Sequence, residues 1–232
     1  MCGIIGYIGK QNALPILMEG LKKMEYRGYD SAGVAVCKHK SVFYEKALGK
    51  IAMLEEKLLN ADDVKGTLGI GHSRWATHGG VTEENAHPHS DCKGEIWLVH
   101  NGIIENHREL KNELLQKGHR FKSETDTEVI AHLIEEELGG APFEDAARNT
   151  LKKIRGTYGL CIMYAKEPEK LIAARNFSPL LLGIGKGEYF VASDASALLA
   201  HTKQIVYLDD GEIAVLTRAK RRIPAFYAQG NL

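Results

Sequence analysis

Short apolar segments separated by turn residues dominate both ends of the sequence, and this pattern limits the fold more than any other feature. An early group contains CGIIGYIG and SAGVAVCK, and a late series contains GLCIMYA, PLLLGIG and EYFVASD. Such segments are typical of antiparallel strands. Several are apolar at consecutive positions, which indicates strands that are covered on both faces.

Helical periodicity appears mainly between these two groups of strands. Segments 14–24 and 107–119 carry apolar residues at helical spacing. A capping box of Thr125 and Glu128 is predicted to open a third helix, and Pro142 is well placed to open a fourth. Strands at the beginning and at the end of the sequence, with helices between them, predict an α+β fold. In such a fold two sheets pack together, and the helices cover their outer faces.

Length and charge narrow the class of protein. A chain of 232 residues suits one large domain. Lys plus Arg and Asp plus Glu both number 30, so nothing favours a nucleic-acid partner or an anionic membrane. The sequence lacks an apolar run of the roughly 18–20 residues that a membrane span needs, and its first residues do not resemble a signal peptide. We expect a cytoplasmic protein, and its oligomeric state is not predicted.

The four cysteines are widely and irregularly spaced, so a disulfide scaffold is not expected. Cys37 and Cys161 lie in apolar strand segments, where cysteine usually packs as a small core residue. His87, His89 and Cys92 have the residue types of a metal site, but they lack the paired spacing of structural zinc sites. We therefore expect a polar loop there, and no metal.

Cys2 differs from the other cysteines because it becomes the first residue when Met1 is removed. It then carries both a thiol and a free α-amine, whose pKa is about 7.7–8. Such an amine suits a general base at neutral pH. It can take the thiol proton and leave the thiolate, which is the nucleophile. A cysteine at position two also arises by chance, so this feature alone does not specify a function.

Three other segments offer groups that suit attack on an amide. The Asn101 side chain and the Gly102 backbone N–H can form an oxyanion hole, although Asn-Gly is also a common turn. Arg74 can bind a carboxylate, and Trp75 can exclude water. Asp126 can pair with a ligand ammonium group or simply favour the start of a helix. Each has an ordinary structural explanation when taken alone.

Taken together, these segments resemble the class II glutamine amidotransferases, which are N-terminal-nucleophile hydrolases. The matching stretches are MCGIIGYIG, EYRGYDSAGVAV, GHSRWATHG, NAHPH, VHNGIIENH, SETDTEVIAHL, SPLLLGIG and VASDASAL. They follow the family's order from residue 1 to about residue 217. YRGYDSAG and RWATHG are similar to the fructose-6-phosphate branch of the family, rather than to the phosphoribosyl-pyrophosphate or asparagine synthetase branches.

The resemblance implies a four-layer αββα sandwich of the N-terminal-nucleophile hydrolase type, with a glutaminase domain over residues 1–217. Cys2 would be the nucleophile and, through its α-amine, the base. Asn101 and Gly102 would form the oxyanion hole. Arg27 would help to order the closed site near Cys2.

The resemblance also implies how glutamine would be held. Arg74 would bind its α-carboxylate and Asp126 its α-ammonium group. Thr77 and His78 would line the glutamine site on a loop that closes over it. Trp75 would gate the exit of ammonia. The implied reaction releases ammonia and glutamate through a γ-glutamyl thioester and needs no cofactor.

Some expectations concern the limits of the chain. The ammonia acceptor, fructose 6-phosphate, would bind a sugar-phosphate isomerase domain that we expect to be absent here. Residues 218–232 are expected to be a flexible tail or a linker. If Met1 were retained, the amine of Cys2 would be locked in a peptide bond and activity severely reduced.

Three alternatives to this function remain at the level of sequence. One is a catalytically silent glutamine-sensing module with the same fold. Another is the glutaminase of a different class II amidotransferase. The third is an amidase that acts on another amide, although the combination of Arg74 with Asp126 suits a free amino acid.

Overall fold

The computed structural model describes residues 2–27, 30–39, 41–61, 63–76, 79–218 and 225–228. Within them the strands form two sheets, and neighbouring strands pair antiparallel. The first sheet has the order β11 (Ile205–Tyr207), β9 (Leu181–Ile184), β10 (Tyr189–Ala192), β1 (Gly3–Ile8), β4 (Leu68–Arg74), β2 (Ser31–Lys38) and β3 (Ser41–Leu48). The second has the order β13 (Ala225–Ala228), β12 (Glu212–Thr217), β8 (Lys170–Asn176), β7 (Gly156–Tyr164), β6 (Ile96–Ile104) and β5 (His89–Ser90).

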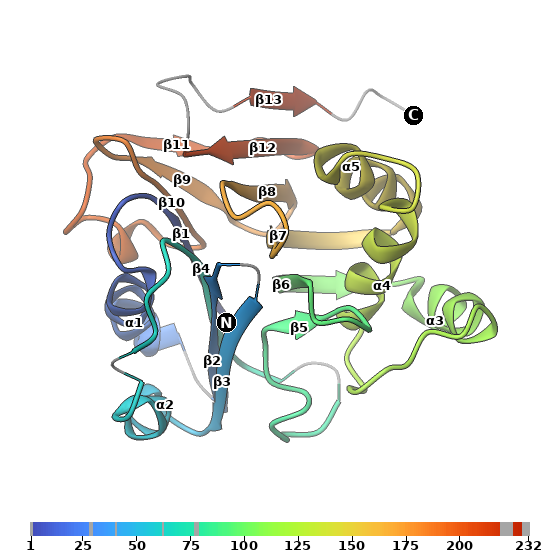
Figure 1. The fold of residues 1–232 in the computed structure, drawn as a ribbon, viewed down its shortest axis with the longest axis horizontal. Coiled ribbons are helices and arrows are strands. Elements are labelled where there is room, and N and C mark those ends of the chain that lie inside the picture. Colours follow the sequence, from blue (N-terminus) through green and yellow to red (C-terminus); the bar gives the residue numbers. More distant parts are fainter. Residues whose placement is uncertain are drawn as a thin grey trace.

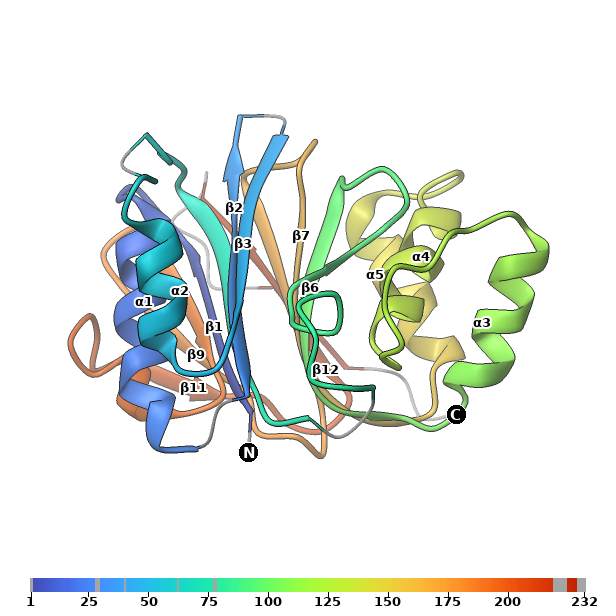
Figure 2. The same ribbon diagram turned by 90° about the horizontal axis from the view of Figure 1, so that it is seen from below.

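Helices cover the outer faces of the two sheets. They are α1 (Ala13–Met24), α2 (Ile51–Leu58), α3 (His107–Gln116), α4 (Glu128–Glu137) and α5 (Phe143–Lys153), with short 3₁₀ helices at Glu25–Arg27 and Ala195–Ala197. Figure 1 shows the arrangement from one side, and Figure 2 shows α1 and α2 on one face, α3 to α5 on the other, and the sheets between them. The predicted four-layer αββα sandwich is confirmed.

The consecutive apolar residues of β1 follow from this layering. Ile5 and Tyr7 pack toward α1, whereas Ile4 and Ile8 pack in the layer between the two sheets. Successive side chains of a strand point to opposite faces, so a strand between two apolar layers needs apolar residues at every position. Each such side chain, when fully buried, stabilises the fold by about 1.5–3 kcal/mol.

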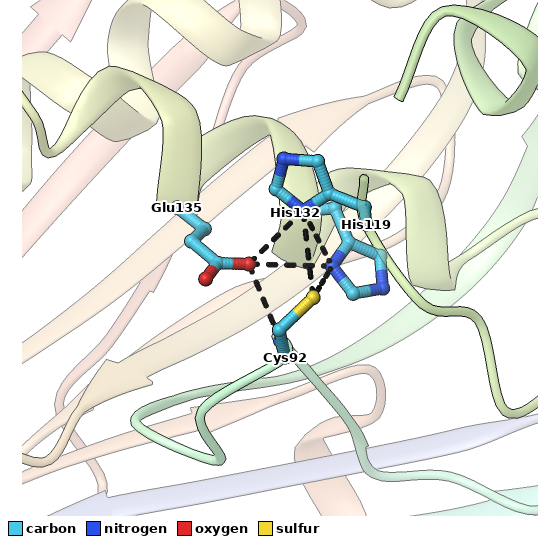
Figure 3. A group of neighbouring side chains, drawn as sticks. All are labelled: Cys92, His119, His132 and Glu135. Carbon is cyan, nitrogen blue, oxygen red and sulfur yellow. Dashed lines mark hydrogen bonds and ion pairs between the residues drawn. The ribbon is translucent and has the colours of Figure 1, made fainter. Parts of the chain in front are cut away.

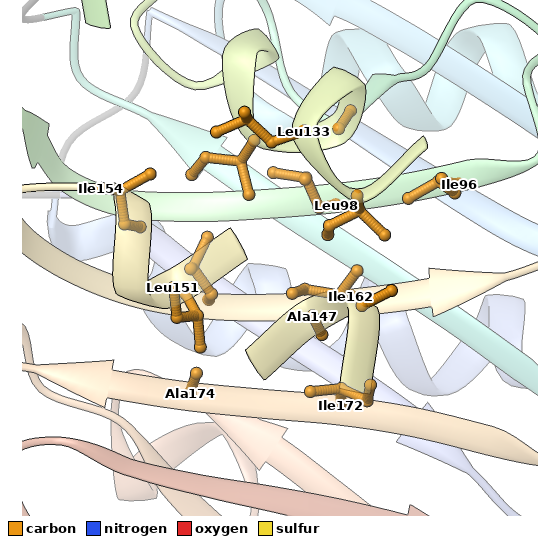
Figure 4. Close-up of a cluster of buried hydrophobic side chains, with 14 of the residues drawn as sticks. Ile96, Leu98, Leu133, Ala147, Leu151, Ile154, Ile162, Ile172 and Ala174 are labelled. Atoms are coloured by element: carbon orange, nitrogen blue, oxygen red, sulfur yellow. The ribbon is translucent and has the colours of Figure 1, made fainter. Parts of the chain in front are cut away.

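A third apolar layer lies between the second sheet and its helices. Ile162 of β7 and Ile172 of β8 pack beneath Ala147 and Leu151 of α5, as Figure 4 shows. The neighbouring residue Cys161 points to the opposite face, into the layer between the sheets. The second sheet is therefore also covered on both faces.

Cys37 and Cys161 are core residues, as predicted, because both are buried in the layer between the sheets. Burial raises the pKa of the Cys37 thiol to about 11 and raises that of Cys161 further. Both thiols are therefore neutral at physiological pH, and neither has the character of a reactive nucleophile.

The start of α4 differs from the predicted capping box. The helix begins at Glu128, and Thr127 rather than Thr125 precedes it. The Glu128 carboxylate accepts hydrogen bonds from the N–H groups of Lys122 (2.8 Å) and Ser123 (2.7 Å). The capping-box prediction was wrong because Glu128 stabilises the loop before the helix rather than the cap itself.

The C-terminal segment contributes at least one strand to the fold. Residues 225–228 form β13, which pairs with β12 at the edge of the second sheet. The other residues of the predicted tail, apart from Arg218, lie outside the described residues, so its assignment as a tail or linker stays a prediction. None of the helices in the described part of the chain combines the length and apolar character needed to cross a membrane.

Candidate active site

Cys2 immediately precedes β1, the middle strand of the first sheet. Gly3 pairs with Ser73 of β4, and this register places Cys2 beside Arg74. The Cys2 sulfur accepts a hydrogen bond from the Trp75 backbone N–H at 3.1 Å. The pairing of the buried strand β1 therefore fixes the position of the thiol. A nucleophile needs such a fixed position.

The thiol of Cys2 is neutral at rest. Burial raises its pKa, and the hydrogen bond from the Trp75 N–H opposes that effect only in part. The Asp30 carboxylate also raises the pKa of the thiol, whereas the Arg74 guanidinium lowers it by favouring the thiolate. Because the sulfur holds its proton, attack on a substrate requires a base at this position.

Asn101 joins the second sheet to Cys2. Its side-chain amide lies on β6 and donates from Nδ2 to the Cys2 carbonyl oxygen at 3.2 Å. The amide oxygen of Asn101 lies 2.9 Å from Nε2 of His72, which is on β4. The structure thus brings together Cys2 and Asn101, which sequence analysis predicted to act in one site.

His72 fixes the orientation of the Asn101 amide. Burial lowers the pKa of His72 to about 3, so the ring is neutral and carries one N–H. An amide oxygen can only accept, and we therefore assign the proton to Nε2, which donates to Asn101 Oδ1. The NH₂ end of the amide must then face Cys2. Sequence analysis missed His72 because an isolated histidine in a strand carries no spacing signal.

Gly102 is required by its backbone conformation. Asn101 and Gly102 lie within β6, paired with Gly159 and Tyr158 of β7, so they do not form the turn considered from sequence. Gly102 has φ of +136°, and a Cβ at this position would overlap the carbonyl oxygen of Thr157. Only glycine fits this conformation without strain.

Arg74 is buried and holds the chain that follows it. Its Nη1 donates to the Gly80 carbonyl at 3.1 Å, and Nη2 lies 3.5 Å from the Gly79 carbonyl. Asp30 supports the same region, because its N–H donates to the Arg74 carbonyl (2.8 Å) and its carboxylate accepts from the Ala76 N–H. Asp30 was not singled out from the sequence.

Other predicted site residues are placed only in part. Thr77, His78 and the side chain of Arg27 lie outside the described residues, so their roles stay predictions. The Trp75 side chain is 57% exposed. In this structure it therefore lies open to solvent, and its role as a gate for ammonia also stays a prediction.

Asp126 is buried close to the end of β6. Its carboxylate accepts a hydrogen bond from the Ile104 N–H at 2.7 Å, two residues beyond Gly102. This contact ties the loop before α4 to the strand that carries the candidate oxyanion hole. Asp126 lies two residues before α4. A favourable interaction of its charge with the start of that helix therefore does not by itself explain why Asp126 is buried.

The segment that contains His87, His89 and Cys92 includes strand β5 and does not bring these three side chains together. The His87 ring lies 4.1 Å from the His72 ring and 4.5 Å from the His89 ring, between ring centres. The Cys92 sulfur instead lies 3.6 Å from Nδ1 of His119. A joint metal site of the three is thus not formed among the described residues.

The buried histidines around the site predict acid sensitivity. Burial lowers the pKa of His72 to about 3 and those of His87, His89 and His100 below their usual value. In the unfolded chain these histidines bind protons near the ordinary histidine pKa of about 6.5, whereas in the folded chain they stay neutral at that pH. The free energy of unfolding should therefore decrease as pH falls below that value. Each histidine contributes up to about 1.4 kcal/mol per pH unit. Urea unfolding at constant ionic strength between pH 7 and 5 checks this, and an unchanged midpoint would contradict it.

The sequence of the chain is similar to that of glutamine amidotransferases. A family model described as a glutamine amidotransferase domain matches residues 72–200. The glutamine–fructose-6-phosphate aminotransferases (isomerizing) of Pyrococcus horikoshii and Thermococcus kodakarensis are 57% and 58% identical to this chain over 219 residues. Each alignment covers 94% of this chain but 36% of the relative, so the chain spans about a third of the length of these curated proteins.

Solved structures show the same fold. The glutamine phosphoribosylpyrophosphate amidotransferase from B. subtilis matches with a TM-score of 0.85 and 28% identity, over 100% of this chain and 50% of that one. A structure described as the allosteric regulatory enzyme of purine biosynthesis matches with a TM-score of 0.82 and 30% identity, over 93% of this chain and 47% of that one. This chain therefore belongs to the glutamine amidotransferase domain family.

Proposed function

We propose that this chain hydrolyses the side-chain amide of glutamine, with Cys2 as nucleophile. The observation that carries the proposal is the hydrogen bond between Asn101 Nδ2 and the Cys2 carbonyl oxygen. This bond holds an amide donor from the second sheet beside a thiol that precedes the central strand of the first. A nucleophile and an oxyanion donor held together by two rigid sheets suit acyl transfer.

The proposed reaction proceeds through a thioester. The α-amine of a processed Cys2 takes the thiol proton, and the thiolate attacks the carboxamide carbon of glutamine. The Asn101 amide and the Gly102 N–H stabilise the resulting oxyanion. When the tetrahedral intermediate collapses, the α-ammonium group gives its proton to the leaving nitrogen and ammonia departs. Water, deprotonated by the same amine, then hydrolyses the γ-glutamyl thioester to glutamate.

Two buried charges are proposed to hold the amino-acid end of glutamine. Arg74 lies beside Cys2 and would bind the α-carboxylate, while Asp126 would bind the α-ammonium group. Both side chains are at most 4% exposed, and ionic hydrogen bonds in such an environment are stronger than in water. A cation and an anion also distinguish a free amino acid from a simple amide.

In the whole protein, we propose that ammonia passes to fructose 6-phosphate. The support is the printed name of the relatives, glutamine–fructose-6-phosphate aminotransferase, at 57% and 58% identity. The acceptor would bind a region outside these 232 residues. This chain alone should then release ammonia from glutamine without forming an amino sugar.

Removing only the charge of Asp126 tests the substrate assignment. Asp126→Asn keeps an oxygen that can accept from the Ile104 N–H, so the fold should persist. Loss of the ionic contact with the α-ammonium group should raise the KM for glutamine roughly 10- to 100-fold, with little change in kcat. Steady-state measurement of ammonia release gives both constants, and thermal unfolding reports the fold.

Asp91→Asn is the matched control for this variant. Asp91 is also a buried aspartate that accepts from backbone N–H groups, those of Glu95 (2.7 Å) and Ile96 (2.9 Å), in the turn between β5 and β6. Its KM should equal that of the unmodified chain. An unchanged KM in Asp126→Asn would exclude the proposed ammonium contact and favour an amidase that acts on a different amide.

A further inference from the structure

Four potential metal ligands from three segments meet near the start of β6, outside the proposed active site. Cys92 lies in the turn between β5 and β6, His119 follows α3, and His132 and Glu135 share one face of α4. One ligand atom from each lies within 4.8 Å of all the others. Figure 3 shows the four side chains converging on a common point.

The distances among these atoms match a tetrahedral cage. The Cys92 sulfur lies 3.6 Å from His119 Nδ1 and 3.5 Å from His132 Nδ1. The two Nδ1 atoms are 3.3 Å apart, and Glu135 Oε2 lies 3.1 Å and 3.4 Å from them. Zinc bonds of ~2.3 Å to sulfur and ~2.0–2.1 Å to nitrogen place tetrahedral neighbours about 3.6 Å (S to N) and about 3.3 Å (N to N) apart.

The outer nitrogens of both imidazoles face carboxylates. His119 Nε2 lies 2.9 Å from Glu136 Oε1, and His132 Nε2 lies 3.6 Å from Glu128 Oε1. A carboxylate that faces the far nitrogen favours a proton there, which leaves the Nδ1 lone pair free. Two Nδ1 lone pairs 3.3 Å apart, with a thiol and a third carboxylate beside them, repel each other unless a proton or a metal ion lies between them.

We propose that Cys92, His119, His132 and Glu135 bind one zinc ion in a structural role. The donor set of one sulfur, two imidazoles and one carboxylate in tetrahedral arrangement suits Zn²⁺ rather than Mg²⁺ or Ca²⁺. With four protein ligands the coordination is complete, so a water nucleophile has no position on the metal. Cys92 is exposed, whereas the His119 and His132 side chains are 7% and 0% exposed, which gives the ion a path to a buried cage.

The ion would fasten three segments of the chain to one another, in addition to single hydrogen bonds such as those from the Cys92 N–H to Glu135 (3.3 Å) and from the Arg120 N–H to the Cys92 sulfur (3.4 Å). It would link the β5–β6 turn and the end of α3 to α4. Asp126 lies two residues before α4, and Asn101 lies on the strand that follows the turn. The proposed zinc would thus stabilise the side of the site contributed by the second sheet. The proposal stands independently of glutamine hydrolysis.

Metal analysis of the untagged full chain tests the proposal. After chelation and dialysis against a small excess of zinc, the chain should retain one zinc per molecule. Its Tm should rise by roughly 5–10 °C over the chelated form when free zinc is about 100 times its Kd. Cobalt(II) in place of zinc should give the visible bands of a tetrahedral ion and a thiolate charge-transfer band.

The cobalt titration is best done in Cys2→Ala protein, because a thiol next to a free amine can itself chelate metals. In that background, Cys92→Ser should lose the charge-transfer band and the zinc-dependent rise in Tm. Cys37→Ser, whose hydroxyl can keep the hydrogen bond to the His39 carbonyl, should retain both. His119→Gln is the second test variant, with the exposed His39→Gln as its control.

Two outcomes would overturn the proposal. In the first, the Tm of the chain is the same with chelator and with zinc, and the chain retains no zinc after dialysis. A proton shared between the two imidazoles would then account for the short distance between their Nδ1 atoms. The other is zinc binding that persists unchanged in both Cys92→Ser and His119→Gln, which would place the ion elsewhere. Because unmodified protein alone distinguishes the first outcome, a variant that fails to fold does not obscure the result.

Discussion

Cys2→Ala should lower the rate of ammonia release from glutamine by roughly 10⁴- to 10⁶-fold. In the proposed reaction the sulfur of Cys2 forms the covalent intermediate, and water held in the same position is a far weaker nucleophile. Ammonia release by purified protein, with intact mass to establish that the chain begins at residue 2, measures the effect. The fold should persist, because the side chain of Cys2 is only half-buried and precedes the pairing of β1.

Cys37→Ser is the matched thiol control for this variant. Cys37 lies in the layer between the sheets, and its neutral thiol has no proposed part in the reaction. Its kcat should stay close to that of the unmodified chain. Ammonia release by Cys2→Ala at the rate of the unmodified chain would rule out Cys2 as nucleophile. No release by an unmodified chain that begins at Cys2 would instead favour a catalytically silent glutamine-sensing module.

Asn101→Asp should lower kcat for glutamine about 10²- to 10³-fold and leave KM nearly unchanged. The variant keeps an oxygen that can accept from His72 Nε2, so the contact with His72 remains, whereas the bond from Nδ2 to the Cys2 carbonyl oxygen is lost. It replaces the NH₂ donor with an anionic oxygen beside the place where the oxyanion develops. Asn106→Asp is a suitable control, because the Asn106 side chain bonds the backbone of Lys153 (2.9 Å) and Arg155 (2.8 Å). A normal kcat in Asn101→Asp would exclude the side chain from the oxyanion hole.

The layered fold could be predicted because burial acts on every residue of a central strand. Strand β1 carries only apolar or aromatic side chains between Ile4 and Ile8, and all of its residues are buried. A strand with one face exposed to water would alternate apolar and polar residues instead. The segment that becomes α1 likewise shows its buried face directly in its spacing. Which strands pair across each sheet was not predictable, since pairing depends on contacts between distant segments.

The residues of the candidate site could be predicted where the nearby sequence indicates their role, and not where the role depends on a contact with a distant residue. Cys2 is recognisable from its place in the chain, and Asn101 with Gly102 from the segment that carries them. His72 and Asp30 were missed, because each acts through a contact that only tertiary structure creates: His72 with Asn101, and Asp30 with Ala76.

The cage of four ligands shows the same limit. Cys92 is 27 residues from His119 and 40 residues from His132 in sequence. Only His132 and Glu135 share a helix face, and a single His-x-x-Glu pair is common on helices. Sequence analysis compared Cys92 with the histidines nearest to it in the chain, His87 and His89. Instead, His87 packs on His72 and His89 packs on His87.

Covalent labelling of processed protein with 6-diazo-5-oxonorleucine, a reactive glutamine analogue, tests the central claim most directly. Intact mass and peptide mapping locate the adduct, while ammonia release from glutamine is followed in the same sample. The account predicts one label per chain, on Cys2, with activity lost in proportion to labelling and with excess glutamine protecting both. Unlabelled Cys2 in a chain that begins with that residue, or a label on Cys92 with activity lost in step, would contradict it.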